Sequence, residues 1–242
     1  MKYDNIREAE FISRPNRFVA EVLLDGEAET VHVKNTGRCR ELLIPGSRVS
    51  LFESANPMRK TRYDLVSVYK KGLGWVNIDS QAPNAAMLEW LESSPGFFGE
   101  IDAVHPEYAR GGSRVDFMLH PKSGGRKILI EVKGCTLEIG GIGYFPDAPT
   151  ERGVKHLREL ADATGEGFEC YIAFVIALPK VVKVVPNIET HREFGRALCD
   201  ALDAGVRALC LPCEVTPDSL RIIGVSEALR TDLFLDPHMP QS

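Results

Sequence analysis

The pattern of apolar and polar residues divides the chain into two parts. Between about residues 14 and 80, short runs of alternating apolar and polar residues are separated by turn residues. These runs cover residues 18–24, 30–33, 47–52, 64–69 and 74–78. Closely spaced short strands of this kind are typical of a small barrel or sandwich. We therefore predict an all-β domain over residues 1–82.

After residue 82 the pattern changes to strands mixed with helices. Apolar residues at helical spacing follow Pro83, and a second such stretch follows Thr150. A third helix is predicted after Thr190, where the spacing of a capping box occurs, and Gly205 is placed to end it. The predicted boundaries are 83–230 for this α/β domain and 231–242 for a loose C-terminal tail.

Length and composition place the chain among ordinary globular proteins. Its 242 residues are 44% apolar and 26% charged. The first residues contain no apolar segment of the kind found in secretory signals. The longest apolar run, residues 171–178, is too short to span a bilayer. The six cysteines are scattered, so we expect reduced thiols, a cytoplasmic location and no membrane partner.

The charge of the chain is unevenly distributed. The net charge is −5, yet residues 34–71 contain nine Lys or Arg against three Asp or Glu, a local charge of +6. Phosphate affinity depends on such local clusters more than on the total charge. The cluster therefore predicts a nucleic-acid partner, and the alternative is an ordinary solvated surface.

Two acidic residues and a lysine on two predicted neighbouring strands are the strongest chemical signal. Asp116 lies in one apolar run, and Glu131 and Lys133 lie in the next. The loop over residues 120–126 contains Pro, Ser and Gly, which favour a tight reversal between the strands. Side chains alternate along a strand, so Glu131 and Lys133 should share one face. Two carboxylates and an ammonium group among apolar residues are costly to bury unless they pair or hold a metal.

These residue types suit a hard divalent cation such as Mg²⁺, with Mn²⁺ as its substitute. Asp116 and Glu131 would supply carboxylates, and the Val132 carbonyl is a third candidate ligand. Such an ion polarises a phosphate and lowers the pKa of a bound water, and Lys133 would orient that water or stabilise developing charge. The alternative is a surface hairpin with a Glu–Lys pair worth at most ~1 kcal/mol.

A second group of polar residues lies on the predicted helix after Thr150. Arg152, Lys155, His156 and Glu159 recur at helical spacing, which predicts one face opposite the apolar side. Cations at a helix N-terminus are disfavoured unless an anion is near, and a phosphate backbone is such an anion. The alternative is a set of solvated side chains beside neighbouring glutamates.

Five segments together carry a resemblance to a known family. They are residues 35–39, 59–60, 113–117, 131–137 and 145–157. From about residue 17 to 225, the chain resembles the sugar fermentation stimulation protein family (SfsA). The resemblance implies an N-terminal OB-like β-barrel followed by a PD-(D/E)XK nuclease-like α/β domain. It also implies DNA binding, the activity attributed to the family.

The resemblance assigns roles to individual residues. Asp116, Glu131 and Lys133 would be the nuclease-type catalytic triad, and Glu107 is a candidate further acid at the metal site. Together with the basic stretches, the resemblance leads us to predict contacts with nucleic acid for the following residues: Asn35, Thr36, Gly37, Arg38, Arg59, Lys60, Arg62, Arg114, Arg152, Lys155 and His156.

An OB-like barrel would add aromatic stacking to this positive charge. Phe52, Tyr63, Tyr69 and Trp75 are the candidate platforms, and the alternative is that they belong to the barrel core. Our main hypothesis is a DNA-binding, Mg²⁺-dependent nuclease. The second is a non-catalytic DNA-binding regulator of sugar metabolism. The sequence leaves the oligomeric state open.

Overall fold

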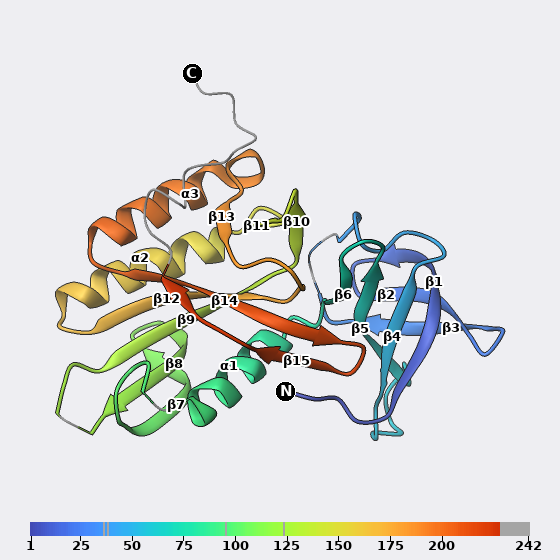
Figure 1. Ribbon diagram of the computed structural model, residues 1–242, viewed down its shortest axis with the longest axis horizontal. Coiled ribbons are helices and arrows are strands. Elements are labelled where there is room, and N and C mark those ends of the chain that lie inside the picture. Colours follow the sequence, from blue (N-terminus) through green and yellow to red (C-terminus); the bar gives the residue numbers. More distant parts are fainter. Residues whose placement is uncertain (36, 38, 95, 123, 228–242) are drawn as a thin grey trace.

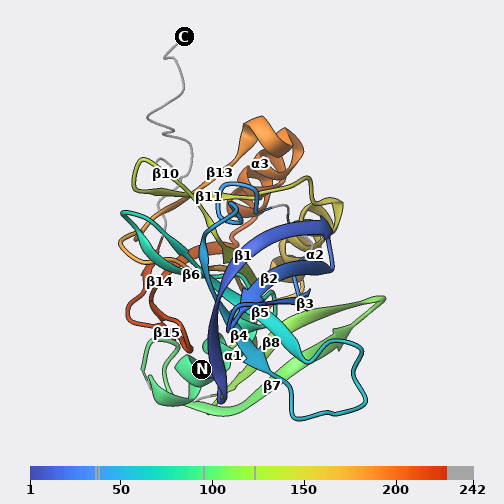
Figure 2. The same ribbon diagram turned by 90° about the vertical axis from the view of Figure 1, so that its right-hand side faces the viewer.

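Six strands form the N-terminal domain of the computed structural model, which describes residues 1–35, 37, 39–94, 96–122 and 124–227. The strands are β1 (Ile6–Asn16), β2 (Val19–Leu24), β3 (Glu27–Val33), β4 (Arg48–Glu53), β5 (Tyr63–Lys70) and β6 (Gly74–Asn77). Their order is β3-β2-β1-β4-β5-β6, and β3 also pairs in parallel with β5. That pairing closes five strands into a barrel, which faces the viewer in Figure 2.

The burial of β5 explains how the barrel is attached to the rest of the chain. Six consecutive residues of this strand, beginning at Tyr63, are buried. Leu65 and Val68 face the barrel core, while Val66 belongs to the apolar cluster of the second domain. A strand covered on both faces needs apolar residues at successive positions, so β5 lacks the simple alternation of a half-exposed strand.

A large mixed sheet forms the second domain. Its strands are β7 (Ile101–Arg110), β8 (Ser113–Pro121), β9 (Ile128–Cys135), β12 (Glu169–Ile176), β14 (Arg207–Thr216), β15 (Ser219–Ile222) and β16 (Ser226–Glu227). The order is β15-β14-β12-β9-β8-β7, with β16 beside β14. Strands β7, β8 and β9 are antiparallel neighbours, whereas β12 is parallel to both β9 and β14.

Three helices cover the two faces of this sheet (Figure 1). They are α1 (Ala82–Ser93), α2 (Glu151–Gly165) and α3 (Ile188–Asp203). Met87 of α1 packs in one apolar cluster with Phe117 and Ile130 of the sheet. Leu157 of α2 lies in the other cluster, on the opposite face. The predicted fold class, an OB-like barrel followed by an α/β domain, is confirmed.

A small second sheet stands beside the barrel. It contains β10 (Leu137–Ile139), β11 (Ile142–Phe145) and β13 (Val184–Pro186). Gly140 and Gly141 connect β10 to β11 with φ angles of 60° and 85°, the left-handed region that a two-residue hairpin turn requires. The Lys70 ammonium donates to a Glu138 carboxylate oxygen at 2.7 Å, so this hairpin is tied to the barrel.

Helix ends were predicted with mixed success. The Thr150 hydroxyl accepts a hydrogen bond from the Gly153 amide at 3.0 Å, which confirms the start of α2. Gly205, with a φ of 99°, follows the end of α3 as predicted. The capping box at Thr190 is wrong, because Asn187 caps α3 and His191 is non-helical.

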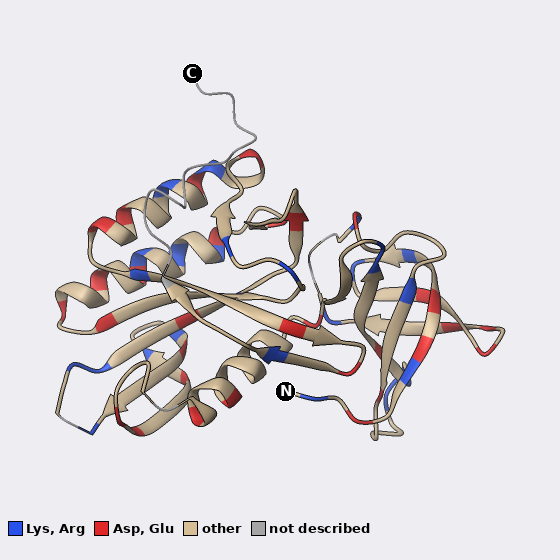
Figure 3. Cartoon of the chain, viewed as in Figure 1, with Lys and Arg blue, Asp and Glu red and all other residues tan. Residues whose placement is uncertain are grey.

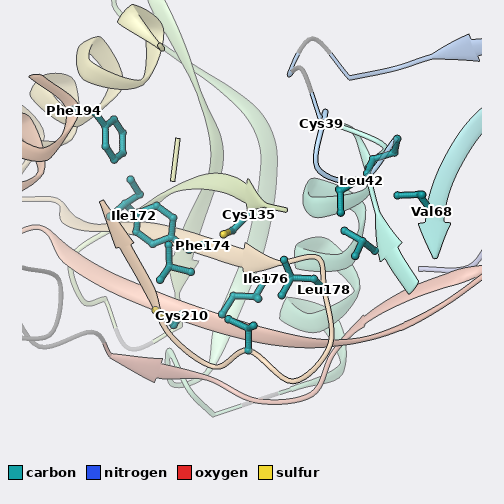
Figure 4. Close-up of a cluster of buried hydrophobic side chains, with 14 of the residues drawn as sticks. Cys39, Leu42, Val68, Cys135, Ile172, Phe174, Ile176, Leu178, Phe194 and Cys210 are labelled. Atoms are coloured by element: carbon teal, nitrogen blue, oxygen red, sulfur yellow. The ribbon is translucent and has the colours of Figure 1, made fainter. Parts of the chain in front are cut away.

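The two domains share one continuous apolar cluster (Figure 4). Leu42 and Val68 of the barrel belong to the same cluster as Phe174 and Phe194 of the second domain. Residues 1–3 also cross over, since the Tyr3 amide donates to the Asp218 carbonyl at 2.7 Å. Within the described part of the chain, no helix combines the length and apolarity needed to cross a bilayer.

We expect Phe174→Ala to destabilise the protein by about 3–5 kcal/mol, because it removes a buried ring and leaves a cavity. Urea unfolding measures this change. Val182→Ala is the matched control, since Val182 is exposed and its truncation should change the free energy of unfolding by less than about 0.5 kcal/mol. Equal losses in the two variants would show that the Phe174 ring does not anchor the core.

Candidate functional site

Strands β8 and β9 separate at Asp116. Their ladder pairs Phe117 with Ile130 and continues no further toward Asp116. Past this pair, the Asp116 carboxylate replaces the backbone of β8 as hydrogen-bond partner of β9. It accepts from the Val132 amide at 2.7 Å. Its other oxygen accepts from the Asn84 side-chain amide at 2.8 Å. Asp116 is therefore held between the sheet and the first turn of α1.

Glu131 is a buried carboxylate on β9, with only 2% of its surface exposed. One of its oxygens, Oε1, accepts from the Lys133 ammonium at 2.5 Å. The same oxygen contacts Nδ1 of His156, which reaches down from α2. Glu131 and Lys133 thus lie on one side of β9, and a basic group from a helix completes their surroundings.

The two carboxyl groups have opposite pKa shifts. Burial raises the pKa of Asp116, and the neighbouring charge of Glu131 raises it further. Burial also acts to raise the pKa of Glu131, but His156 and Lys133 outweigh it, and the pKa is lowered. Glu131 therefore carries a firmly held negative charge beside a second carboxyl that resists ionisation.

A divalent cation fits this pair chemically. The repulsion between Glu131 and Asp116 is what a bound cation would relieve, and both residues offer the hard oxygen ligands that Mg²⁺ prefers. The Val132 amide already serves Asp116, and a role for the Val132 carbonyl stays a prediction.

Glu107 stands apart from the two buried acids. Its neighbours Pro106 and Tyr108 pair with Phe117 and Val115 of β8, so Glu107 comes opposite Asp116 in the register. Its side chain is 64% exposed, however, and lies 3.8 Å from Arg114. Across the described residues, no group of three or more His, Cys, Asp or Glu is arranged to hold a metal.

His156 occupies a different place from the one predicted. The helical spacing placed it on a polar face opposite the apolar side of α2, together with Arg152 and Lys155. It is instead 7% exposed and contacts Glu131, so it lies on the face of α2 that covers the sheet. Arg152 Nε donates to His156 Nε2 at 3.2 Å from the exposed side. Lys155 is exposed and lies 3.6 Å from Glu159.

Two residues have roles at this site that the sequence did not indicate. Asn84 directly follows Pro83, where a helix was predicted, and nothing in its local sequence indicates that it reaches β8. His156 was identified but given a phosphate contact in place of its contact with Glu131. A small pocket brings His156 and Glu131 together with Arg114 of β8, which is itself largely exposed.

Much of the predicted positive charge of the barrel is neutralised by acids. Asp64 is fully buried (0% exposed), and Arg59 Nη1 donates to it at 3.0 Å. Lys34 lies 3.1 Å from the same carboxylate. Arg62 pairs with Glu53 at 2.6 Å. Arg59 and Arg62 are therefore not freely available to phosphate, contrary to the simplest reading of the local charge, whereas Lys60 is exposed.

The loop after β3 forms an Asx-type turn. The Asn35 side chain accepts from the Gly37 amide at 2.7 Å and donates to the Ile78 carbonyl at 2.8 Å. A Cβ atom at Gly37 would collide with the Asp147 carboxylate, which explains the need for glycine there. The predicted contacts of Thr36 and Arg38 with nucleic acid fall outside the described residues.

The aromatic residues of the barrel divide between core and surface. Tyr63 is buried, so it is not a stacking platform. Tyr69 is 37% exposed, and its ring centroid lies 5.6 Å from that of Trp75. The Arg48 guanidinium is 5.4 Å from both rings. This surface combines exposed aromatic area with a cation.

Two protein-family descriptions match the chain. Residues 12–78 match the SfsA N-terminal OB domain. Residues 81–219 match the sugar fermentation stimulation protein RE domain. Together the two matches cover most of the chain.

Relatives of known name agree with this assignment. A sugar fermentation stimulation protein homolog of Desulfitobacterium hafniense is 54% identical over 220 residues, which are 91% of this chain and 94% of the relative. One of Clostridium beijerinckii is 49% identical over 222 residues, with 92% and 96% covered. The solved structure of Pyrococcus furiosus SfsA in complex with Ca²⁺ has a TM-score of 0.80 and 30% identity, with 92% and 96% covered.

The Asp64 network predicts a pH-dependent contribution to stability. Burial acts to raise the pKa of Asp64, but Arg59, Lys34 and His32 lower it to about 2. The stabilisation should be complete above the pKa of an unfolded aspartate, about 4, and should be lost as the pH falls toward 2. Asp64→Asn should therefore cost about 2 kcal/mol at neutral pH and progressively less below pH ~4.

Urea unfolding of the parent and Asp64→Asn at several pH values measures this difference. Asp162→Asn is the control, because Asp162 is exposed on α2 and its loss should have little effect at any pH. A difference for Asp64→Asn that stays constant between neutral and acidic pH would contradict the assigned charge network.

Proposed function

The chain belongs to the sugar fermentation stimulation protein family, and from that premise we propose that it is a metal-dependent phosphodiesterase acting on nucleic acid, with DNA as the expected substrate. The observation that carries the proposal is the convergence of Asp116, Glu131 and Lys133 where β8 and β9 separate. Buried acids beside an ammonium group, with basic side chains at the rim, suit cleavage of a phosphate diester.

A hard divalent cation is the proposed cofactor, Mg²⁺ or Mn²⁺, held by Asp116 and Glu131 with the Val132 carbonyl as a further ligand. The Pyrococcus furiosus relative is described in complex with Ca²⁺, another cation that takes oxygen ligands, which supports this choice. When bound, such an ion supplies Lewis acidity toward the phosphate and a more acidic water.

Hydrogen bonds hold the side chains of the proposed site in defined positions. Asn84 and the Val132 amide fix both oxygens of Asp116, so its carboxylate has one defined orientation. Lys133 is mostly buried and donates to Glu131, which keeps its ammonium group where negative charge would develop on a reacting phosphate. No rearrangement of the backbone is needed to bring these groups together.

Nucleic acid would approach from the exposed side of α2 and the turn between β7 and β8. Arg152 and Lys155 are exposed on that helix, and Arg114 is exposed at the start of β8, next to the turn. Figure 3 shows the Lys and Arg of α2 in the first half of the helix, after Glu151, and Glu and Asp in its second half, so the positive charge is local. Lys60, Tyr69 and Trp75 supply candidate contacts on the barrel.

A second candidate is a non-catalytic DNA-binding protein that regulates sugar metabolism. The engagement of Glu131 by both Lys133 and His156 favours it, because such a network can satisfy a buried carboxylate with no metal. Both candidates act on nucleic acid, and we expect either in the cytoplasm. Cleavage and metal binding distinguish them.

We expect Asp116→Asn to abolish Mn²⁺- or Mg²⁺-dependent cleavage of single- and double-stranded DNA, with a loss of at least about 100-fold. The change removes a charge while keeping the size of the side chain. Cleavage assays on labelled oligonucleotides measure the rate, and calorimetry measures Mn²⁺ affinity. Asp162→Asn is the matched control on the exposed face of α2. Equal cleavage by the parent and Asp116→Asn, or none by the parent, would defeat the catalytic proposal.

DNA binding should depend on salt and on the exposed cations near the site. Arg114→Gln and Lys155→Gln should each weaken binding and reduce the slope of log K against log[salt] by about 1. Fluorescence anisotropy at several salt concentrations measures both quantities. Arg221→Gln, an exposed arginine on β15 paired with Glu214, serves as the control. Salt-independent binding would count against a phosphate contact at either residue.

A further inference from the structure

Arg152, His156 and Glu131 form a chain of hydrogen bonds with one direction. Arg152 Nε donates to His156 Nε2 at 3.2 Å, and His156 Nδ1 contacts Glu131 Oε1. A guanidinium group can only donate, so Nε2 of His156 must accept. The remaining ring proton then lies on Nδ1 and points to the Glu131 carboxylate. Arg152 at Nε2 and the Glu131 carboxylate at Nδ1 therefore both require the same tautomer of the imidazole.

The outer end of this chain is open to a ligand. Arg152 lies in the first turn of α2 and is exposed, while His156 one turn later is buried. Among the described residues, the contact with His156 is the one hydrogen bond that the structure shows for the Arg152 side chain. It uses Nε and leaves the two Nη groups, which have the paired geometry that phosphate oxygens accept.

Resting on the proposed function, we propose that Arg152 and His156 form a relay between a phosphate of bound nucleic acid and the metal-binding carboxylate of Glu131. Arg152 touches the phosphate through Nη1 and Nη2 and holds His156 through Nε. His156 is a positioning residue, which fixes Oε1 of Glu131 and leaves Oε2 to face the cation.

Lys133 is the other partner of Glu131 in this arrangement. Its ammonium donates to the same Oε1 atom and lies 3.4 Å from His156 Nδ1. An ammonium group has three donors, so Lys133 can contact a reacting phosphate as well as Glu131. His156 directs its one ring N–H at Glu131 and so keeps the carboxylate in place. Partners that orient a ligating side chain typically change metal affinity 10- to 100-fold when they are lost.

The first test is the tautomer of His156, which involves no metal. The ¹⁵N chemical shifts of the imidazole in the full-length protein distinguish a protonated Nδ1 from a protonated Nε2, and His156→Asn identifies its signals among those of six histidines. We expect a protonated Nδ1 and an unprotonated, hydrogen-bonded Nε2 in the parent and in Arg158→Gln, the matched control on α2 that pairs with Glu193. Arg152→Gln should keep the Nδ1 proton, because the Glu131 carboxylate still accepts it, but its Nε2 signal should move to that of a nitrogen without this hydrogen bond. An unchanged Nε2 signal in Arg152→Gln, or a proton on Nε2 in the parent, would overturn the relay.

The second test is Mn²⁺ affinity by calorimetry. An asparagine amide can replace Nδ1–H as a donor to Glu131 but cannot accept from Arg152 in the same way. We therefore expect His156→Asn to bind Mn²⁺ nearly as well as the parent and His156→Leu to bind it about tenfold more weakly. Equal loss in both variants would indicate a purely structural role and overturn the proposal.

The third test links the phosphate to the metal. A saturating phosphorothioate DNA oligonucleotide should tighten Mn²⁺ binding about fivefold or more in the parent and in Arg158→Gln, and much less in Arg152→Gln or His156→Asn. Equal tightening in all four proteins would overturn the relay while leaving the proposed function intact. A parent that binds no Mn²⁺, with or without DNA, would overturn the proposed function and the metal-linked part of the relay together.

Discussion

The buried charge of Glu131 is the constraint on which the site depends. A carboxylate removed from water costs several kcal/mol unless basic partners compensate for it. Lys133 supplies one partner from the same strand, and His156 supplies the other from α2. The contact with Glu131 therefore fixes the position and the rotation of α2 above β9. Burial of its apolar residues Leu157 and Leu160 requires the same placement. Core packing and the hydrogen bond from His156 to Glu131 specify the same docking of α2.

The barrel obeys the same rule at Asp64. Lys34, Arg59 and His32 all contact this fully buried carboxylate. These three basic side chains therefore stabilise the fold and are less available to a ligand. Counting cations along the sequence consequently overstates the positive charge that reaches the surface. In Figure 3, positions of Lys and Arg are interspersed with positions of Asp and Glu along the strands of the barrel.

Most local signals in the sequence were reliable, whereas signals that depend on tertiary packing were not. The barrel strands from residue 18 onward, the cap at Thr150 and the glycine at position 205 follow from neighbouring residues, and the structure has them as predicted. The capping box at Thr190 is wrong, and β1 was not predicted. The side of α2 occupied by His156 could not be read in this way. A residue at the edge of the apolar stripe of a helix can lie on the buried or on the exposed face, so the packing of α2 against β9 determines where His156 lies. Asn84 is similar, since its partner lies 32 residues away in sequence.

The hydrogen bonds of Glu131 and Asp116 indicate how the affinity for a cation would depend on the binding of nucleic acid. Glu131 already has two basic partners, and Asp116 already accepts two hydrogen bonds, so the protein alone offers few uncommitted ligand oxygens. Mg²⁺ is usually bound by one or two carboxylates together with substrate phosphate and water. On the proposed function, affinity for the cation should therefore rise when a phosphate arrives. Basic residues at the rim of α2 then matter to the metal as well as to the nucleic acid, although they touch only the latter.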